Sequence, residues 1–92
     1  MQLPVTSSRD LGQIVRAVRK EAGVRLDDLA AIVGVSKQFT SDVEHGKPTV
    51  QLERVLRVLA ELGIEFSVEV PAAIEPRLQQ LRKAGSLRKK QA

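Results

Sequence analysis

The chain of 92 residues contains no cysteine, tryptophan or tyrosine, and Phe39 and Phe66 are its only aromatic residues. The absence of cysteine excludes disulfide bonds and thiolate metal ligands. Because His45 is the only histidine, the chain also cannot offer a pair of histidines to a metal ion or to catalysis. The sequence also contains no recognisable combination of acid, base and nucleophile and no Gly-rich phosphate loop. We therefore expect no metal site, no cofactor and no enzymatic activity.

Long apolar runs are also missing. No segment has the pattern of a signal peptide, and none approaches the ~20 consecutive apolar residues that a membrane-spanning helix needs. We therefore expect a cytoplasmic protein without a membrane partner. With so few aromatic residues, the core must consist of Leu, Val, Ile and Ala, which suits one small helical bundle.

The net charge of +4 is unevenly distributed along the chain. Residues 1–71 contain nine basic and ten acidic residues, whereas residues 72–92 contain six basic residues and one acidic residue. The high isoelectric point is therefore a property of the C-terminal tail. Any affinity of the remaining chain for nucleic acid must come from a local basic patch.

The spacing of apolar residues predicts four helices before residue 63. The first begins at the Ser-x-x-Asp capping box of Ser7 and ends at Gly23. The others cover residues 26–33, 36–44 and 51–62. Their expected inner faces contain Leu11, Ile14, Val15, Val18 and Ala22 on the first helix, with Arg16, Arg19, Lys20 and Glu21 outside, and Leu52, Val55, Leu56, Leu59 and Leu62 on the fourth.

Residues 26–45 have the spacing of a helix-turn-helix, which presents its second helix to the DNA major groove. Gly34 follows the first of these helices, where a positive φ ends a helix at little steric cost. Ser36 is a natural N-cap for the second helix, and Val43 is its inward anchor. We expect Thr40 and Glu44 to have structural roles.

The outward side chains of the third predicted helix suit recognition of base edges. Gln38 can pair bidentately with adenine, Lys37 can reach guanine or a phosphate, and Phe39 can contact a thymine methyl group. Asp42 fits a salt bridge better than a base contact. The turn that follows can bind phosphate through its backbone and two side chains. The predicted DNA-binding residues are Arg25, Ser36, Lys37, Gln38, Phe39, Ser41, His45 and Lys47. The alternative is a solvated helix face.

Residues 64–70 alternate apolar and polar side chains before Pro71, which is typical of a half-buried strand. It is the only predicted strand, so its backbone groups need a partner from another chain. We expect the same strand of a second copy to provide that partner in a symmetric homodimer. The predicted dimerisation residues are Ile64, Phe66, Val68 and Val70. The alternative is a segment that extends loosely over the bundle.

Residues 11–63 resemble the lambda-repressor-like helix-turn-helix family, of the Cro or XRE type. The residues that carry the resemblance are Leu29-Ala30, Gly34-Val35-Ser36, Ser41, Val43-Glu44, Gly46 and the apolar helix 52–62. With the strand that follows and the segment 46–52, the chain is most similar to HipB-type antitoxins. That resemblance implies an operon-repressing homodimer that binds a HipA-like Ser/Thr kinase toxin.

One departure from the family pattern lies at the start of the second predicted helix. Members of the family usually have Thr or Ser followed by Gln there, whereas this chain has Arg25 and Leu26. The hydroxyl cap is lost, although the charge of Arg25 can still contact a phosphate.

The C-terminal tail, residues 71–92, contains a pattern for a short helix between Pro76 and Gly85. We expect residues 86–92 to lack fixed structure. Three interpretations of the tail remain open: an arm that contacts the DNA backbone, a segment that binds the toxin, or a solvated end.

The predicted fold is an all-α, lambda-repressor-like bundle of four to five helices, followed by one β-strand that pairs across a homodimer. Its parts are a lead-in (1–10), the helix-turn-helix domain (11–63), the dimerisation strand (64–70) and the basic tail (71–92). The predicted function is repression of transcription at a palindromic operator, as the antitoxin of a HipBA-like pair. The protein would then associate with the bacterial nucleoid when bound. The alternatives are a stand-alone regulator and a protein-interaction module without DNA binding.

Overall fold

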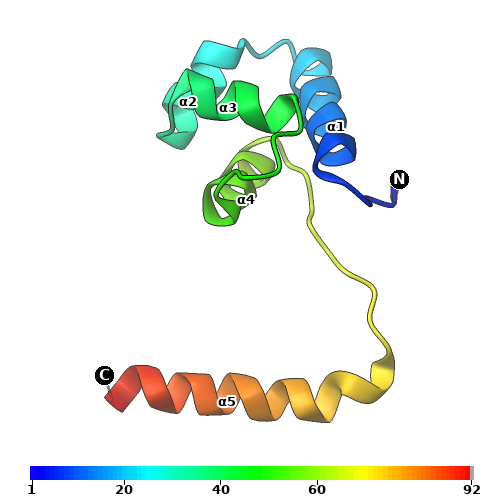
Figure 1. Cartoon of the computed structure of the whole chain (residues 1–92), viewed down its shortest axis with the longest axis vertical. Coiled ribbons are helices and arrows are strands. Elements are labelled where there is room, and N and C mark those ends of the chain that lie inside the picture. Colours follow the sequence, from blue (N-terminus) through cyan, green and yellow to red (C-terminus); the bar gives the residue numbers. More distant parts are fainter. Residues whose placement is uncertain (92) are drawn as a thin grey trace.

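The computed structural model describes the backbone of residues 1–91 and the side chains of residues 1–85. In this part of the chain it contains five α-helices and one 3-10 helix and no strand. The first four helices pack together, and an extended segment leads from them to the fifth (Figure 1). The elements are α1 (Ser8–Glu21), α2 (Leu26–Val33), α3 (Lys37–Glu44), α4 (Leu52–Glu61), η1 (Ala72–Ile74) and α5 (Glu75–Gln91).

All four bundle helices contribute to one aliphatic core, as the composition predicts. On α4 the buried residues are Val55, Val58 and Leu59. The prediction for this helix was wrong at two positions, because Leu52 and Leu56 are 63% and 38% exposed. The inner face of α4 is rotated toward Val58, which the sequence pattern had not selected. The core residues are Val15, Leu29, Val43, Val55, Val58 and Leu59.

The helix ends mostly follow the predicted caps. The Ser7 hydroxyl accepts a hydrogen bond from the Asp10 backbone N–H at 3.0 Å, which satisfies a free donor at the start of α1. Gly34 ends α2 with a φ of 81°, in the left-handed region. Ala22, predicted on the inner face of α1, is instead the exposed residue after that helix.

A buried ion pair joins the end of α3 to α1. Arg19 donates from Nε to Glu44 Oε2 at 2.6 Å and from a terminal nitrogen to Glu44 Oε1 at 2.9 Å. It also donates to the backbone carbonyl of Val24 at 3.0 Å. The hydrogen bond with Glu44 raises the pKa of Arg19. The prediction that Arg19 faces solvent was wrong, whereas the structural role predicted for Glu44 is confirmed.

Residues 64–70 have neither helical nor strand structure in the single chain. Ile64 does not share the exposure of the other predicted dimerisation residues, because it packs against the core. The remaining three, Phe66, Val68 and Val70, are 53%, 71% and 56% exposed. A strand needs a neighbour, so pairing across a homodimer stays a prediction.

The C-terminal helix is longer than the sequence predicted. α5 does not end at Gly85 but continues to Gln91, and Ala92 lies outside the described residues. Gly85 does not have a positive φ, so it is an interior helical residue and not a cap. A single glycine costs only about 1 kcal/mol in a helix, and Leu, Arg, Lys and Gln, which follow it, are good helix formers.

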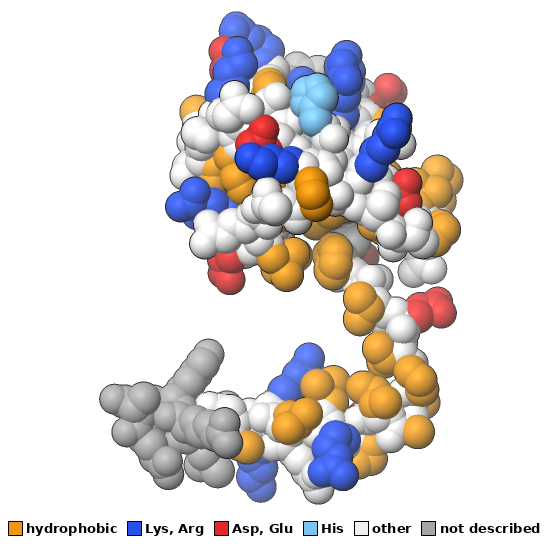
Figure 2. Space-filling view, in the orientation of Figure 1, with side chains coloured by type: hydrophobic (Ala, Val, Ile, Leu, Met, Phe, Trp, Pro, Cys, Tyr) orange, Lys and Arg blue, Asp and Glu red, His pale blue; other side chains and the backbone are white. Residues whose placement is uncertain are grey.

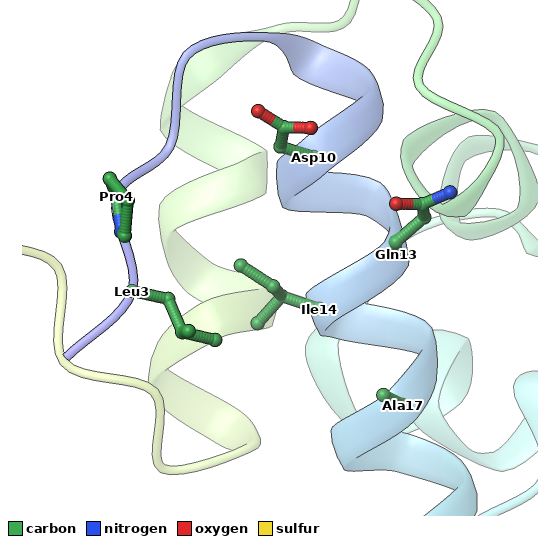
Figure 3. Close-up of a pocket in the computed structure, with 6 residues that line it drawn as sticks. All are labelled: Leu3, Pro4, Asp10, Gln13, Ile14 and Ala17. Atoms are coloured by element: carbon green, nitrogen blue, oxygen red, sulfur yellow. The ribbon is translucent and has the colours of Figure 1, made fainter. Parts of the chain in front are cut away.

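The N-terminal segment passes over α1, where Leu3 points toward Ile14 (Figure 3). A shallow pocket lies there between the segment and the helix, with Asp10 at its rim. Thr6 donates to Asp10 from its hydroxyl at 2.8 Å and from its backbone at 3.2 Å. These bonds lower the pKa of Asp10. The last three residues of the predicted lead-in, 8–10, already belong to α1.

Candidate nucleic-acid interface

The helix-turn-helix is formed by α2, the turn of residues 34–36 and α3. The Ser36 hydroxyl accepts a hydrogen bond from the Phe39 backbone N–H at 2.9 Å, which caps α3 as predicted. On the inner side Val43 and Thr40 are both buried, and the Thr40 hydroxyl donates to the Lys37 carbonyl of the same helix at 2.7 Å. The structural role predicted for Thr40 is therefore confirmed. These inward contacts fix which side of α3 faces solvent.

The outward side of α3 carries a row of polar side chains at helical spacing. Lys37 and Gln38 are exposed in the first turn, Ser41 is partly exposed one turn later, and His45 follows at the end of the helix. Figure 2 shows basic side chains around the histidine on the visible face of the bundle, with acidic side chains among them. The helix thus presents donors and acceptors along one side, as a helix in the major groove must.

Phe39 was predicted to belong to this outward row, but it does not. It is only partly exposed, and its side chain packs against the core. The prediction started from an exposed ring, so that premise was wrong. The ring's burial stabilises the packing of α3.

Two carboxylates on this surface form salt bridges with its basic side chains, and Asp27 is the first. Its Oδ1 lies 3.0 Å from Lys37 Nζ, and its Oδ2 lies 3.6 Å from a terminal nitrogen of Arg25. The hydrogen bond from Lys37 lowers the pKa of Asp27, and the charge of Arg25 contributes in the same direction. Asp27 therefore connects the start of α2 to the start of α3, a role that the sequence analysis missed.

Asp42 is the second carboxylate. Its Oδ1 accepts a hydrogen bond from Gln38 Nε2 at 2.9 Å, one helical turn earlier. Its Oδ2 lies 3.6 Å from Nζ of Lys47, in the turn after α3. The salt bridge predicted for Asp42 is confirmed. The contact with Gln38 was not predicted, although i, i+4 spacing allows it.

His45 has a defined ring orientation. Its Nδ1 lies 2.7 Å from the Ser41 carbonyl oxygen and 3.4 Å from the Ser41 hydroxyl. A carbonyl only accepts hydrogen bonds, so Nδ1 carries the hydrogen. This leaves Nε2 as the ring nitrogen that is available to an external group.

The turn after α3 is held against the start of α1. Gly46 has a φ of 76°, and a Cβ there would lie 2.6 Å from the Cα of Arg9. Its carbonyl accepts a hydrogen bond from the Ser8 hydroxyl at 2.8 Å. This close approach fixes the backbone between His45 and Lys47, two of the predicted phosphate contacts.

Two other features were sought among the described residues, a group of metal ligands and a membrane-spanning helix. Over residues 1–85, no group of three or more His, Asp and Glu side chains is placed to hold a metal ion. In the same part of the chain, no helix is long and apolar enough to cross a membrane.

Comparison with known proteins agrees with this geometry. A family model described as a helix-turn-helix domain matches residues 10–66. A curated relative from Sinorhizobium fredii (strain NBRC 101917 / NGR234) is described as an uncharacterized HTH-type transcriptional regulator, y4mF. It is 43% identical over 67 residues, which cover 73% of this chain and 88% of the relative.

Solved structures of HipB have the same fold. A HipA-HipB-O2-O3 complex contains a chain that matches with a TM-score of 0.70 and 19% identity, covering 75% of this chain and 97% of the other. A HipB-O4 20mer complex matches with a TM-score of 0.69 and 19% identity, covering 75% and 97%.

Proposed function

The chain belongs to the helix-turn-helix family of XRE-type transcriptional regulators, and on that premise we propose that it is a homodimeric repressor that reads a palindromic operator. The observation that carries the proposal is the row of side chains on the outer side of α3. Gln38 lies in this row, and Lys47 follows it in a turn of fixed backbone. Gln38 supplies base recognition, whereas His45, Lys47 and Arg25 contact phosphates.

Two substitutions separate these roles. Gln38→Ala should cost about 1–3 kcal/mol of specific binding and relax the base preference at one position in each half-site. Lys47→Ala should weaken binding to all sequences alike and reduce the salt dependence by about one phosphate contact. Fluorescence anisotropy with a selected duplex and a scrambled duplex over a salt series measures both effects. If Gln38→Ala loses the same affinity for both duplexes, Gln38 is not a base-reading residue.

The homodimer is supported by apolar surface that the single chain leaves exposed. Phe66, Val68 and Val70 are exposed on the segment after the bundle, and Leu52 and Leu56 are exposed on α4. In a strand, the alternating positions 66, 68 and 70 would share one side. Figure 2 shows hydrophobic side chains along the segment that connects the bundle to α5. Pairing of two such segments would bury this surface and satisfy the backbone groups of both strands.

A double substitution tests the dimer. Phe66→Asp with Val68→Asp should give monomers in sedimentation velocity, because it places charges in the proposed interface. Ser67→Asp is the matched control: it adds a charge on the opposite side of the same segment and should stay dimeric. A double variant that stays dimeric would show that this segment is not the interface.

The antitoxin role is the finer proposal. It is supported by the fold shared with HipB in a HipA-HipB complex and by the exposed apolar segment. The test is to co-express the chain with a neighbouring kinase-like reading frame and to purify the complex. A stable complex supports the antitoxin role, which we place in the cytoplasm and at the nucleoid when the protein is bound to DNA. Its absence favours a stand-alone regulator.

A protein-interaction module without DNA binding is the alternative from another class. It is favoured by the two carboxylates of the interface, since Asp27 pairs with Lys37 and Asp42 lies near Lys47. Salt-dependent binding to duplex DNA discriminates the two functions, because an interaction module would show none.

A further inference from the structure

Asp42 lies in the candidate DNA interface, yet its charge opposes DNA binding. It is half-buried on α3, between the proposed base-reading Gln38 and the proposed phosphate contact Lys47. A carboxylate there repels nearby phosphates and weakens the attraction of Lys47 to them. A residue that lowers affinity in this way fits a role in selectivity.

The contact between Asp42 and Gln38 determines how the glutamine amide is oriented. Gln38 has one carbonyl oxygen and two N–H donors, and Asp42 accepts one of the donors at 2.9 Å. A carboxylate cannot donate, so the reverse orientation would place two acceptors face to face. The amide is therefore held with one N–H bound to Asp42, and with Oε1 and the second N–H available.

We propose that Asp42 is a positioning residue that makes adenine the base selected by Gln38; this inference rests on the proposed DNA-binding function. Adenine presents N7 as an acceptor and N6–H as a donor, which match the remaining N–H and Oε1 of Gln38. Guanine presents two acceptors, O6 and N7. An unrestrained amide can turn both N–H groups toward guanine, whereas the amide bound to Asp42 has only one left. Asp42 thus adds discrimination against a wrong base.

The experiment compares four variants with the wild-type chain. Binding sites are first selected from a pool of randomised duplexes, and Gln38→Ala then identifies the base pair that Gln38 reads. Asp42→Ala should reduce the preference for adenine over guanine at that base pair about tenfold, a loss within the range of one bidentate contact. The same variant should bind scrambled DNA more tightly, because a negative charge has left the interface.

Asp42→Asn tests whether the orientation depends on a group that only accepts. The asparagine amide can accept from Gln38 or donate to it, so it no longer excludes the reverse orientation, and the preference for adenine should fall as it does in Asp42→Ala or by less. The charge is lost, so binding to scrambled DNA should rise as it does for Asp42→Ala. Asp27→Ala is the matched control: it removes a carboxylate of the same surface that binds Lys37 and Arg25 and for which no bond to Gln38 is found. It should strengthen binding without changing the preference at the Gln38 base pair.

Several outcomes would overturn the inference. An unchanged adenine preference in Asp42→Ala would show that the contact does not orient the amide. Equal losses of adenine preference in Asp42→Ala and in the charge control Asp27→Ala would assign the effect to charge. Both results leave the proposed function intact, provided that the wild-type chain selects a sequence. A wild-type chain that enriches no sequence would contradict the proposed function itself, and this inference with it. Thermal unfolding of each variant checks that the fold is kept.

Discussion

At the scale of single residues, the pair of Arg19 and Glu44 joins the interface helix to the rest of the bundle. The two side chains are only 11% and 5% exposed, and the arginine also binds the backbone carbonyl of Val24. Because α1 and α3 meet at this pair, it contributes to the position of the whole outer side of α3.

Removing one partner should be costly. Glu44→Ala leaves the Arg19 guanidinium buried without its carboxylate, and the free energy of unfolding should fall by about 3 kcal/mol. Urea unfolding followed by circular dichroism measures the change. The double variant Arg19→Met with Glu44→Leu should recover most of the loss, because it buries no unpaired charge. A single variant as stable as wild type would show that solvent already screens the pair.

The sequence could not have predicted this pair, nor the role of Gly12. Arg19 lies among the polar residues of α1, and only the packing of α3 brings Glu44 to it across 25 positions of sequence. Gly12 is buried in α1, where a Cβ would lie 2.4 Å from the Val43 carbonyl oxygen. Periodicity says which side of a helix is inside, but it does not say which helix is close enough to require glycine.

At the scale of elements, α2 lacks a side-chain hydrogen bond at its N-terminus. Its N-cap, Arg25, has an extended backbone that suits a cap, but its side chain makes no capping hydrogen bond. The ion pair of Arg25 with Asp27 is exposed, so it contributes little to stability. The comparison of Arg25 with the Thr or Ser usual in the family had predicted the loss of this cap.

Restoring the cap should stabilise the protein. Arg25→Ser should raise the free energy of unfolding by about 1 kcal/mol, since a serine hydroxyl can accept a hydrogen bond from the first turn of α2. Arg25→Ala is the control: it removes the same cation without adding a cap, so it should give no gain. Thermal melting compares the two. The hypothesis of a missing cap fails when both variants melt together.

Prediction succeeded best where one element contains its own signal. The caps at Ser7 and Ser36 and the bounds of α2 depend on neighbouring residues, and they are confirmed. The predicted buried face of α4 was wrong at Leu52 and Leu56, because exposed leucines can follow the same periodicity as buried ones. The prediction that the last helix ends at Gly85 was wrong, because a glycine can end a helix but does not have to. The predicted DNA contacts stay predictions.

At the scale of the whole molecule, the chain divides into a bundle and a separate basic helix. The matched helix-turn-helix region ends at residue 66, whereas α5 begins at Glu75 and lies away from the bundle (Figure 1). Leu81 is 63% exposed on it, and Ile74 just before it is 37% exposed. Among the residues whose side chains are described, 1–85, none from α5 belongs to the core, so the bundle should fold without this helix.

Truncation tests this division and the role of the tail. Deleting residues 72–92 should leave the melting temperature and the dimer nearly unchanged, because no core residue is lost. If the tail contacts the DNA backbone, the truncated protein should bind DNA more weakly and with a smaller salt slope, since six basic residues are removed. If it binds the toxin, DNA binding should persist while capture of the kinase is lost.

A charge variant of the intact chain completes this test. Replacing Arg77, Arg82 and Lys83 with Gln keeps the length of α5 but removes half of the tail's basic residues. An arm that acts through charge should lose part of its DNA affinity in this variant, in proportion to the cations removed, whereas a tail recognised through its apolar residues should not.

The truncation could also contradict the division of the chain into a bundle and a separate helix. A truncated protein that unfolds or becomes monomeric would place α5 in the core of the dimer. The separate position of this helix in one chain would then reflect the missing second copy.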